Sequence, residues 1–291
     1  MAHSAPLPGT VWWPSSFLAP SPRGAPLASA YAAAAERSSR SVGLPDASAL
    51  APRAPIALIA LNVAPRQLDY GAEVLHRLWR LADVTIAADG AANRLREADA
   101  ALPAAAQRVP GHLTGDMDSI EPAALEHFRA RGSSVAVDAS QDRHDFDKCL
   151  RLLESLEGGR FAEATVFVLG SVGGRVDHGA ATLSTLCRHP HLRIVLLSNC
   201  NTSVLLSPGS HTILHDPELE TGTCGLLPLF GRCTVSTTGF RWNLEGGELA
   251  MDGMCSSSNQ AEPAAAGQPH VLTVDAHGPL LWTMELIDLG L

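Results

Sequence analysis

Between about residues 54 and 203, hydrophobic residues form short, continuous runs that alternate with segments of helical periodicity. The runs occupy residues 56–61, 84–88, 134–137, 164–169 and 193–197. Uninterrupted apolar runs of this length are typical of strands buried on both faces, as in a parallel sheet. Between the runs, apolar residues recur every three or four positions, which predicts amphipathic helices. We therefore expect residues 54–203 to form an α/β domain, Rossmann-like and three-layered, with a mostly parallel sheet.

After about Ser203 the helical periodicity stops, and short β-like runs separated by Gly, Pro and Asn take over. These runs lie at 203–206, 211–215, 224–230, 234–238, 248–254, 270–275 and 281–287. Several short strands at this spacing are typical of a β-sandwich. We therefore expect residues 204–291 to form an all-β domain, a jelly-roll-like sandwich.

The first 53 residues are rich in Ala, Pro and Ser and carry few acids. Low complexity and frequent proline predict a disordered extension. Arginine and serine with few acids also fit an organellar transit peptide, so both interpretations stay open.

Composition and charge narrow the classes of function. The formal net charge is −9 at pH 7, so a nucleic acid is not an expected partner. The six cysteines contain no Cys-x-x-Cys pair, which disfavours a zinc ribbon or a redox motif and is typical of reduced thiols. No apolar run reaches the length of a membrane span. We expect a cytoplasmic protein, unless the extension directs it to an organelle.

Two aspartates one residue apart, Asp116 and Asp118, follow a short apolar segment and a glycine turn. If that segment is extended, alternate side chains share a face, and both carboxylates point the same way. Close like charges repel, and Mg²⁺, which usually arrives with substrate phosphates, offsets the repulsion. The simpler alternative is a polar turn that caps the next helix, with Ser119 or Asp118 as N-cap and Pro122 in the first turn.

Other charged residues begin predicted helices. Asp89 ends the run at 84–88 and opens a helix, where open α/β sheets bind ligands, although an N-cap role alone would explain it. Asp145 stands in the first turn of a later helix, and Lys148 lies three residues on, on the same helix surface. The lysine could meet a phosphate oxygen while the aspartate meets a metal ion.

A glycine-rich segment, residues 170–178, follows another predicted strand. Its glycines allow the backbone to approach a phosphate closely, and Arg175 could clamp the phosphate in bidentate fashion. The segment is neither a P-loop nor a Gly-x-Gly-x-x-Gly fingerprint, so alone it is weak evidence.

Taken in order, these motifs resemble the thiamine pyrophosphokinase family. The similar segments are 88–94, 115–120, 141–150, 174–177, 237–244, 256–259 and 279–284. The resemblance runs from about residue 56 to residue 287. It implies transfer of a pyrophosphoryl group from ATP to the hydroxyl of thiamine, which gives thiamine diphosphate and AMP. It also implies Mg²⁺ and a homodimer whose active site lies between the α/β domain of one subunit and the β domain of the other.

The resemblance also implies roles for individual residues. Residues expected to act in catalysis are Asp116, Asp118, Asp145, Lys148 and Arg175. Residues expected to hold Mg²⁺ are Asp89, Asp116, Asp118 and Asp145. Residues expected to bind ATP are Asp89, Asn93, Gln141, Asp142 and Asp177. Residues expected to bind thiamine are Trp242, Ser256, Ser258 and Asn259, because a flat aromatic cation suits an aromatic face with hydroxyl and amide groups.

The chain departs from the family's pattern at Ala91, where a glycine is usual, and at His144, where a threonine is common. No aromatic residue closely follows 256–259, so the residue that stacks on thiamine stays open. The alternative functions are a metal-dependent nucleotide-sugar glycosyltransferase and a thiamine- or nucleotide-binding protein without catalysis. A haloacid-dehalogenase-type phosphatase is disfavoured, because Gly115 separates the apolar segment from Asp116.

Overall fold

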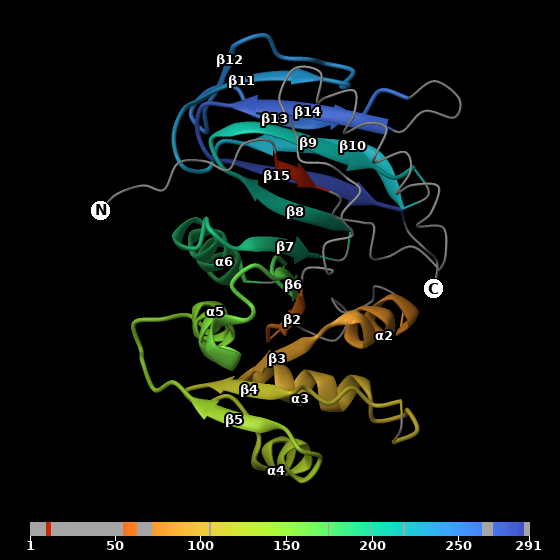
Figure 1. The fold of residues 1–291 in the computed structure, drawn as a ribbon, viewed down its shortest axis with the longest axis vertical. Coiled ribbons are helices and arrows are strands. Elements are labelled where there is room, and N and C mark those ends of the chain that lie inside the picture. The colour runs from red at the N-terminus through yellow and green to blue at the C-terminus, as the bar shows by residue number, and fades with distance from the viewer. Residues whose placement is uncertain are drawn as a thin grey trace. The chain divides into compact units, whose positions relative to one another are not determined.

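The computed structural model describes residues 10–12, 55–62, 72–104, 106–173, 175–198, 200–217, 219–263 and 270–287. These residues fold as two compact units: one comes from the range 54–200, and the other comes from the ranges 1–53 and 201–288 (Figure 1). The prediction of an α/β domain and an all-β domain is confirmed. None of the described helices is both long and apolar enough to cross a membrane.

The first unit is built on a parallel sheet with the strand order β7-β6-β2-β3-β4-β5. Its strands are β2 (Ile56–Ala60), β3 (Val84–Ala88), β4 (His112–Gly115), β5 (Ser134–Val137), β6 (Thr165–Leu169) and β7 (Arg193–Leu197). Its helices are α2 (Ala72–Leu81), α3 (Asp89–Ala98), α4 (Pro122–Ala130), α5 (Asp145–Ser155) and α6 (Val176–Arg188), with the 3-10 turn η3 (Leu156–Gly159). Every residue of the central strand β2 is buried, as its continuous apolar run predicts.

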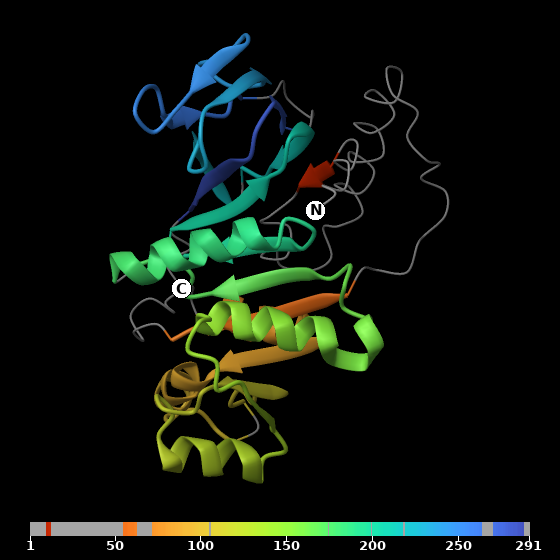
Figure 2. The ribbon, with the colours of Figure 1, turned by 90° about the vertical axis from the view of Figure 1, so that its left-hand side faces the viewer.

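The order of the strands determines which face each helix covers. From β2 the chain adds β3, β4 and β5 on one side, then returns to the other side of β2 with β6 and β7. Because crossovers between parallel strands are right-handed, this reversal moves the later helices to the opposite face. Figure 2 shows α5 and α6 in front of the strands, whereas α2 lies on the other side of them in Figure 1. The helix α3 begins directly after the carboxyl end of β3, and α5 is the next helix after the carboxyl end of β5.

The second unit contains two groups of strands. One is the sheet β1-β9-β14-β11-β12, and the other is the antiparallel set β13-β10-β15-β8. The strands are β1 (Thr10–Trp12), β8 (Asn201–Leu206), β9 (Gly209–His215), β10 (Glu220–Leu227), β11 (Cys233–Thr238), β12 (Gly247–Leu249), β13 (Ser256–Gln260), β14 (His270–Ala276) and β15 (Leu280–Leu286). Burial alternates along β11 and β8, which places one face of each strand in the core. Phe240 and Trp282 meet edge to face in that core, with ring centroids 5.7 Å apart.

Two details differ from the sequence predictions. Within the extension predicted to be disordered, Thr10–Trp12 form β1, which pairs in parallel with β9; the other residues of the extension lie outside the described residues. The run at 248–254 is a strand only at its start, in β12, because residues 251–253 form a turn. The segment 256–259, predicted as a binding motif, is also part of the strand β13.

Candidate active site

Four aspartates follow the carboxyl ends of neighbouring strands in the α/β unit. Asp89 follows β3, Asp116 and Asp118 follow β4, and Asp145 begins α5 after β5. One carboxylate oxygen from each of Asp89, Asp116 and Asp118 lies within 4.8 Å of the others. Carboxylate oxygens at this spacing are the ligands that Mg²⁺ prefers, so the donor set fits the expected metal ion. We call these four aspartates the acid cluster.

A glycine allows Asp89 to approach the loop after β4. Gly115 has a φ of 151°, and a Cβ at this position would lie 2.7 Å from Asp89 Cγ. Asp89 is buried, and its two oxygens accept hydrogen bonds from the N–H groups of Gly90 at 2.6 Å and Met117 at 3.1 Å. Met117 has a left-handed φ of 68°, uncommon for a residue other than glycine. Asp89 thus holds the turn that carries Asp116 and Asp118.

The simpler alternative for the Asp116–Asp118 turn, helix capping, does not match the structure. The N-cap of α4 is Glu121, and Pro122 is in its first turn. Asp118 is exposed, and Ser119 Oγ donates to its Oδ1 at 2.8 Å. Neither Asp118 nor Ser119 serves as the N-cap, so capping does not account for this pair of acids.

Lys148 lies among the carboxylates with only 2% of its side chain exposed. Its Nζ is 3.1 Å from Asp116 Oδ2 and 3.7 Å from Asp145 Oδ1. Burial acts to lower the pKa of Lys148, but Asp116 and Asp145 outweigh it and raise that pKa. The lysine is therefore a charged ammonium group at neutral pH, held by α5 beside two acids.

The acids differ in how readily they carry charge. Burial acts to raise the pKa of Asp116, but hydrogen bonds from Lys148, the Asp118 N–H and Gln141 outweigh it and hold that pKa at about 2. Burial raises the pKa of Asp89, and the charges of Asp145 and Asp116 add to the rise. Burial also raises the pKa of Asp145, although Lys148 opposes this. Lys148 thus stabilises the charged form of Asp116 most. A bound cation would stabilise the charged forms of Asp89 and Asp145.

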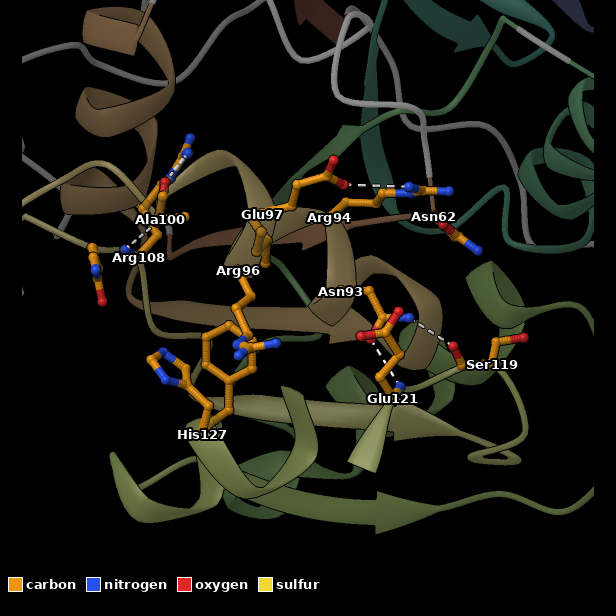
Figure 3. A pocket seen from close by; sticks show the side chains of 14 residues that line it. Asn62, Asn93, Arg94, Arg96, Glu97, Ala100, Arg108, Ser119, Glu121 and His127 are labelled. Atoms are coloured by element: carbon orange, nitrogen blue, oxygen red, sulfur yellow. Dashed lines mark hydrogen bonds and ion pairs between the residues drawn. The ribbon is translucent and has the colours of Figure 1, made fainter. Parts of the chain in front are cut away.

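The residues expected to bind ATP fall into different environments. Gln141 Nε2 donates to Asp116 Oδ2 at 3.1 Å, so Gln141 is joined to the acid cluster. Asp142 is exposed to solvent. The Asn93 amide donates to Ser119 O at 2.8 Å and accepts from Glu121 N at 2.9 Å, which fastens the loop after β4 to α3 (Figure 3).

Arg175 and Asp177 bind each other at the start of α6. The arginine donates from Nε and Nη2 to the two Asp177 oxygens at 3.0 and 2.5 Å. This pairing lowers the pKa of Asp177 to about 2. Both side chains are exposed, and Asp177 is not part of the carboxylate group formed by Asp89, Asp116 and Asp118 among the described residues. The structure thus places Asp177 where it orients the guanidinium of Arg175.

In the β unit, Asn259 holds together the segments expected to bind thiamine. Its buried amide donates to Trp242 O at 2.9 Å and to Ser256 Oγ at 3.4 Å, and its Oδ1 accepts from Trp242 N at 3.4 Å. Trp242 is 55% exposed, with the Arg241 guanidinium 4.9 Å from its ring centroid. Ser258 is exposed with a left-handed φ of 59°. An aromatic face, a hydroxyl and an irregular stretch of the strand β13 therefore belong to this unit.

A pocket of about 830 Å³ lies in the α/β unit (Figure 3). Its lining comes mainly from α3, α4 and the segments next to them, and includes Asn62, Asn93 and Ser119. The sequence analysis did not single out Asn62. Its Nδ2 lies 2.3 Å from the position that a Cβ on Gly90 would take, so the absence of a side chain at Gly90 makes room for it. No spacing in the sequence indicates this contact. None of the four acids lines the pocket.

The sequence matches two family models, "Thiamin pyrophosphokinase, catalytic domain" over residues 75–196 and "Thiamin pyrophosphokinase, vitamin B1 binding domain" over residues 210–268. Among curated relatives, Thiamine pyrophosphokinase 1 of Arabidopsis thaliana is 34% identical over 226 residues, which cover 74% of this chain and 82% of that protein. Thiamine pyrophosphokinase 1 of Oryza sativa subsp. japonica is 33% identical over 72% of this chain and 81% of that protein. The crystal structure of yeast thiamin pyrophosphokinase superposes with a TM-score of 0.70 at 21% identity, over 82% of this chain and 88% of that chain, and so supports the fold.

Proposed function

The chain belongs to the thiamine pyrophosphokinase family, and from this premise we propose that it transfers the pyrophosphoryl group of ATP to the hydroxyl of thiamine. The products are thiamine diphosphate and AMP. The observation that carries the proposal at the level of the site is the acid cluster around the buried ammonium group of Lys148. Family membership disfavours the glycosyltransferase, and the presence of every expected acid, with Lys148 and Arg175, disfavours a protein that binds without catalysis.

We propose that Asp89, Asp116, Asp118 and Asp145 hold Mg²⁺. Bound there, Mg²⁺ neutralises charge on the phosphate oxygens of ATP, which transfers of this kind require. Three of these carboxylates lie within 4.8 Å of one another, and the raised pKa values of Asp89 and Asp145 mark charges that a cation would stabilise. Asp116 is ionised throughout the neutral range, since its pKa is about 2.

The chemistry of the chain's own residues is positioning and charge stabilisation. In the proposed reaction the thiamine hydroxyl oxygen attacks the β-phosphorus of ATP in line, and the bond from that phosphorus to the α-phosphate oxygen breaks, so that AMP leaves. Lys148 stabilises charge on the transferring group, and Arg175, oriented by Asp177, stabilises the departing oxygens. Gln141 and Asp142 contact the nucleotide. A carboxylate of the acid cluster, such as Asp145, accepts the hydroxyl proton.

We propose that the β unit binds thiamine, with Trp242 as the aromatic face and Ser256, Ser258 and Asn259 around it. The exposure of Trp242 and the hydrogen bonds of Asn259 to its backbone support this assignment. We also propose a homodimer in which the acids of one subunit face the β unit of the other. Its support is that the two sets of residues lie in different units and that the family resemblance pairs them across subunits.

The detailed architecture of each unit and the cellular location of the protein are also proposals. We infer a Rossmann-like three-layer arrangement in the first unit from its parallel sheet and reversed strand order, and a jelly-roll-like sandwich in the second from its two groups of strands. We infer a cytoplasmic location because Cys149, Cys224 and Cys233 are thiols rather than disulfides, as in a reducing compartment. Import of a fluorescent fusion into an organelle would overturn that location.

Purified protein with ATP, Mg²⁺ and thiamine tests the proposed reaction. We expect AMP and thiamine diphosphate to form together. ADP with thiamine monophosphate would mean that a single phosphoryl group is transferred, and no product with retained thiamine binding would mean a silent binding protein.

A further inference from the structure

A second group of potential metal ligands lies in the α/β unit, apart from the acid cluster. Glu154 near the end of α5, His189 directly after α6 and His191 each offer one ligand atom, and these atoms lie within 4.8 Å of one another. His191 Nε2 is 2.7 Å from Glu154 Oε1. We propose that these three residues bind a divalent transition-metal ion of the Zn²⁺ type.

His189 is arranged as a metal ligand usually is. Its Nε2 lies 2.8 Å from Asp147 Oδ1, and because a carboxylate only accepts, Nε2 carries the proton. Its Nδ1 is buried and has no hydrogen-bond partner among the residues that the structure describes. Ligating histidines commonly donate their second ring N–H to a carboxylate, which fixes the tautomer and leaves the other nitrogen for the metal. Asp147 therefore prepares Nδ1 of His189 to bind a cation.

The backbone holds the two histidines close together. The sequence His189-Pro190-His191 follows α6, and Leu192 N donates to His189 O at 3.1 Å, which closes a turn. Proline fixes its own φ and restricts the residue before it, so the turn has little freedom to lose on binding. The ring centroids of the two histidines are 5.8 Å apart. The site thus needs only small side-chain movements to close on an ion.

The types of ligand separate this site from the acid cluster. Imidazole suits Zn²⁺, Cu²⁺ and Ni²⁺, whereas Mg²⁺ prefers oxygen ligands. Two histidines and a glutamate are a recurring set of protein ligands for zinc, with water in the fourth position. The 57% exposure of the His191 side chain leaves room for that water. A bound ion would link the end of α5 to the turn before β7. The helix α5 is also the one that carries Asp145 and Lys148.

Calorimetry with Zn²⁺, and visible absorption with Co²⁺ as its spectroscopic substitute, tests the proposal on the full-length protein in saturating Mg²⁺. We expect one ion per chain bound by nitrogen ligands. His191→Ala should weaken binding by about 100-fold or more, and Glu154→Gln by about 10-fold or more. The matched controls His76→Ala and Glu163→Gln change exposed residues of the same unit and should bind as the wild type does.

A second readout protects the test against misfolding. Zn²⁺ should raise the Tm of the wild type and of both controls, and should leave the Tm of His191→Ala unchanged. Equal affinity for Zn²⁺ in His191→Ala and the wild type would overturn the proposal, as would a wild type that takes up no Zn²⁺ or Co²⁺ in the presence of Mg²⁺. Because the readout is metal binding, its failure leaves the proposed pyrophosphoryl transfer untouched.

Discussion

Lys148 Nζ lies 3.1 Å from Asp116 Oδ2 in a partly buried setting, and this pair is the electrostatic centre of the proposed active site. The pKa of Asp116 is about 2, below its ordinary value of 3.8. A depressed carboxyl pKa contributes stability that is present above the unfolded pKa and is lost as the pH falls toward the folded value. The pair is therefore intact at neutral pH, where it can meet substrate phosphates.

Replacing Lys148 with methionine removes the ammonium group and keeps the length of the side chain. We expect kcat to fall by about 100-fold or more, because charge on the transferring group loses its stabilising partner. Arg151→Met is the matched control, since it removes a cation from the exposed side of the same helix. Steady-state assays should show a large effect in the first variant and almost none in the second; equal rates in both would refute the role of Lys148.

Binding of Mg²⁺ should stabilise the folded protein in a pH-dependent way. Burial raises the pKa values of Asp89 and Asp145, so protons compete with Mg²⁺ at a higher pH than for ordinary aspartates. With Mg²⁺ at about 100 times its Kd, the gain is about 2.7 kcal/mol. We expect the increase in Tm on adding Mg²⁺ to be large at neutral pH and to shrink as the pH falls toward the raised pKa values of these two acids.

The same thermal measurement identifies the ligands. Asp118→Asn should lose most of the increase in Tm with Mg²⁺, whereas Glu126→Gln, an exposed change of the same charge on α4, should retain it. If Asp118→Asn gains as much from Mg²⁺ as the wild type, the metal does not bind at the acid cluster.

Gly115→Ala should damage the site through contact rather than charge. The added methyl group would lie 2.7 Å from Asp89 Cγ, so the buried carboxylate and the loop must separate. A displacement of about 1 Å near the reacting groups costs about 100-fold in rate. Gly132→Ala is the control, since Gly132 also has a positive φ, but no atom of the described residues lies within 4 Å of the added Cβ. Both variants should lose some stability, and only Gly115→Ala should lose activity.

Mixing two inactive variants tests whether the active site is shared between subunits. Asp116→Asn lies in the α/β unit and Asn259→Ala in the β unit, and circular dichroism must first show that each is folded. If sites are shared, a mixed dimer has one site with both lesions and one with neither. Activity should then return to at most about half of wild type per mixed dimer. Demonstrated mixed dimers without activity would show that each chain builds its own site.

Trp12 changes the expectation for the amino-terminal extension. The sequence alone predicts that deleting residues 1–53 leaves solubility and activity nearly unchanged. In the structure Trp12 is buried, its indole N–H donates to His211 Nδ1 at 3.3 Å, and β1 pairs with β9. We therefore expect the deletion to lower the Tm, and Trp12→Ala to lower the free energy of unfolding by about 3 kcal/mol or more. Unfolding curves identical to wild type would contradict this.

The sequence could predict the main elements because their signals are local. The runs at 56–61 and 84–88 identified β2 and β3, since a strand covered on both faces must be apolar throughout. The strand β1 was missed because Thr10–Trp12 is too short to show a pattern within a Pro-rich segment. Its pairing with β9, about 200 residues away, has no local signature.

The site was predictable in its residue types but only partly in its roles. Asp116, Asp118 and Asp145 could be expected to converge, because parallel strands end at the same edge of a sheet. Other roles depend on contacts between distant segments, which the sequence does not reveal. The Asn93 amide fastens the loop after β4 through both its nitrogen and its oxygen, and the Asn259 amide holds Trp242. The family resemblance implies that Asn93 and Asn259 bind substrates. Their hydrogen bonds show that they also hold neighbouring segments in place.

Product identity in one reaction tests the central claim most directly. Phosphorus NMR of the purified protein with ATP, Mg²⁺ and thiamine should show AMP and thiamine diphosphate appearing in equal amounts, with no AMP when thiamine is omitted. The same mixture with Asp116→Asn should form neither product while the variant unfolds with the cooperativity of the wild type. Formation of ADP, release of AMP without thiamine, or wild-type turnover by Asp116→Asn would contradict pyrophosphoryl transfer at the acid cluster.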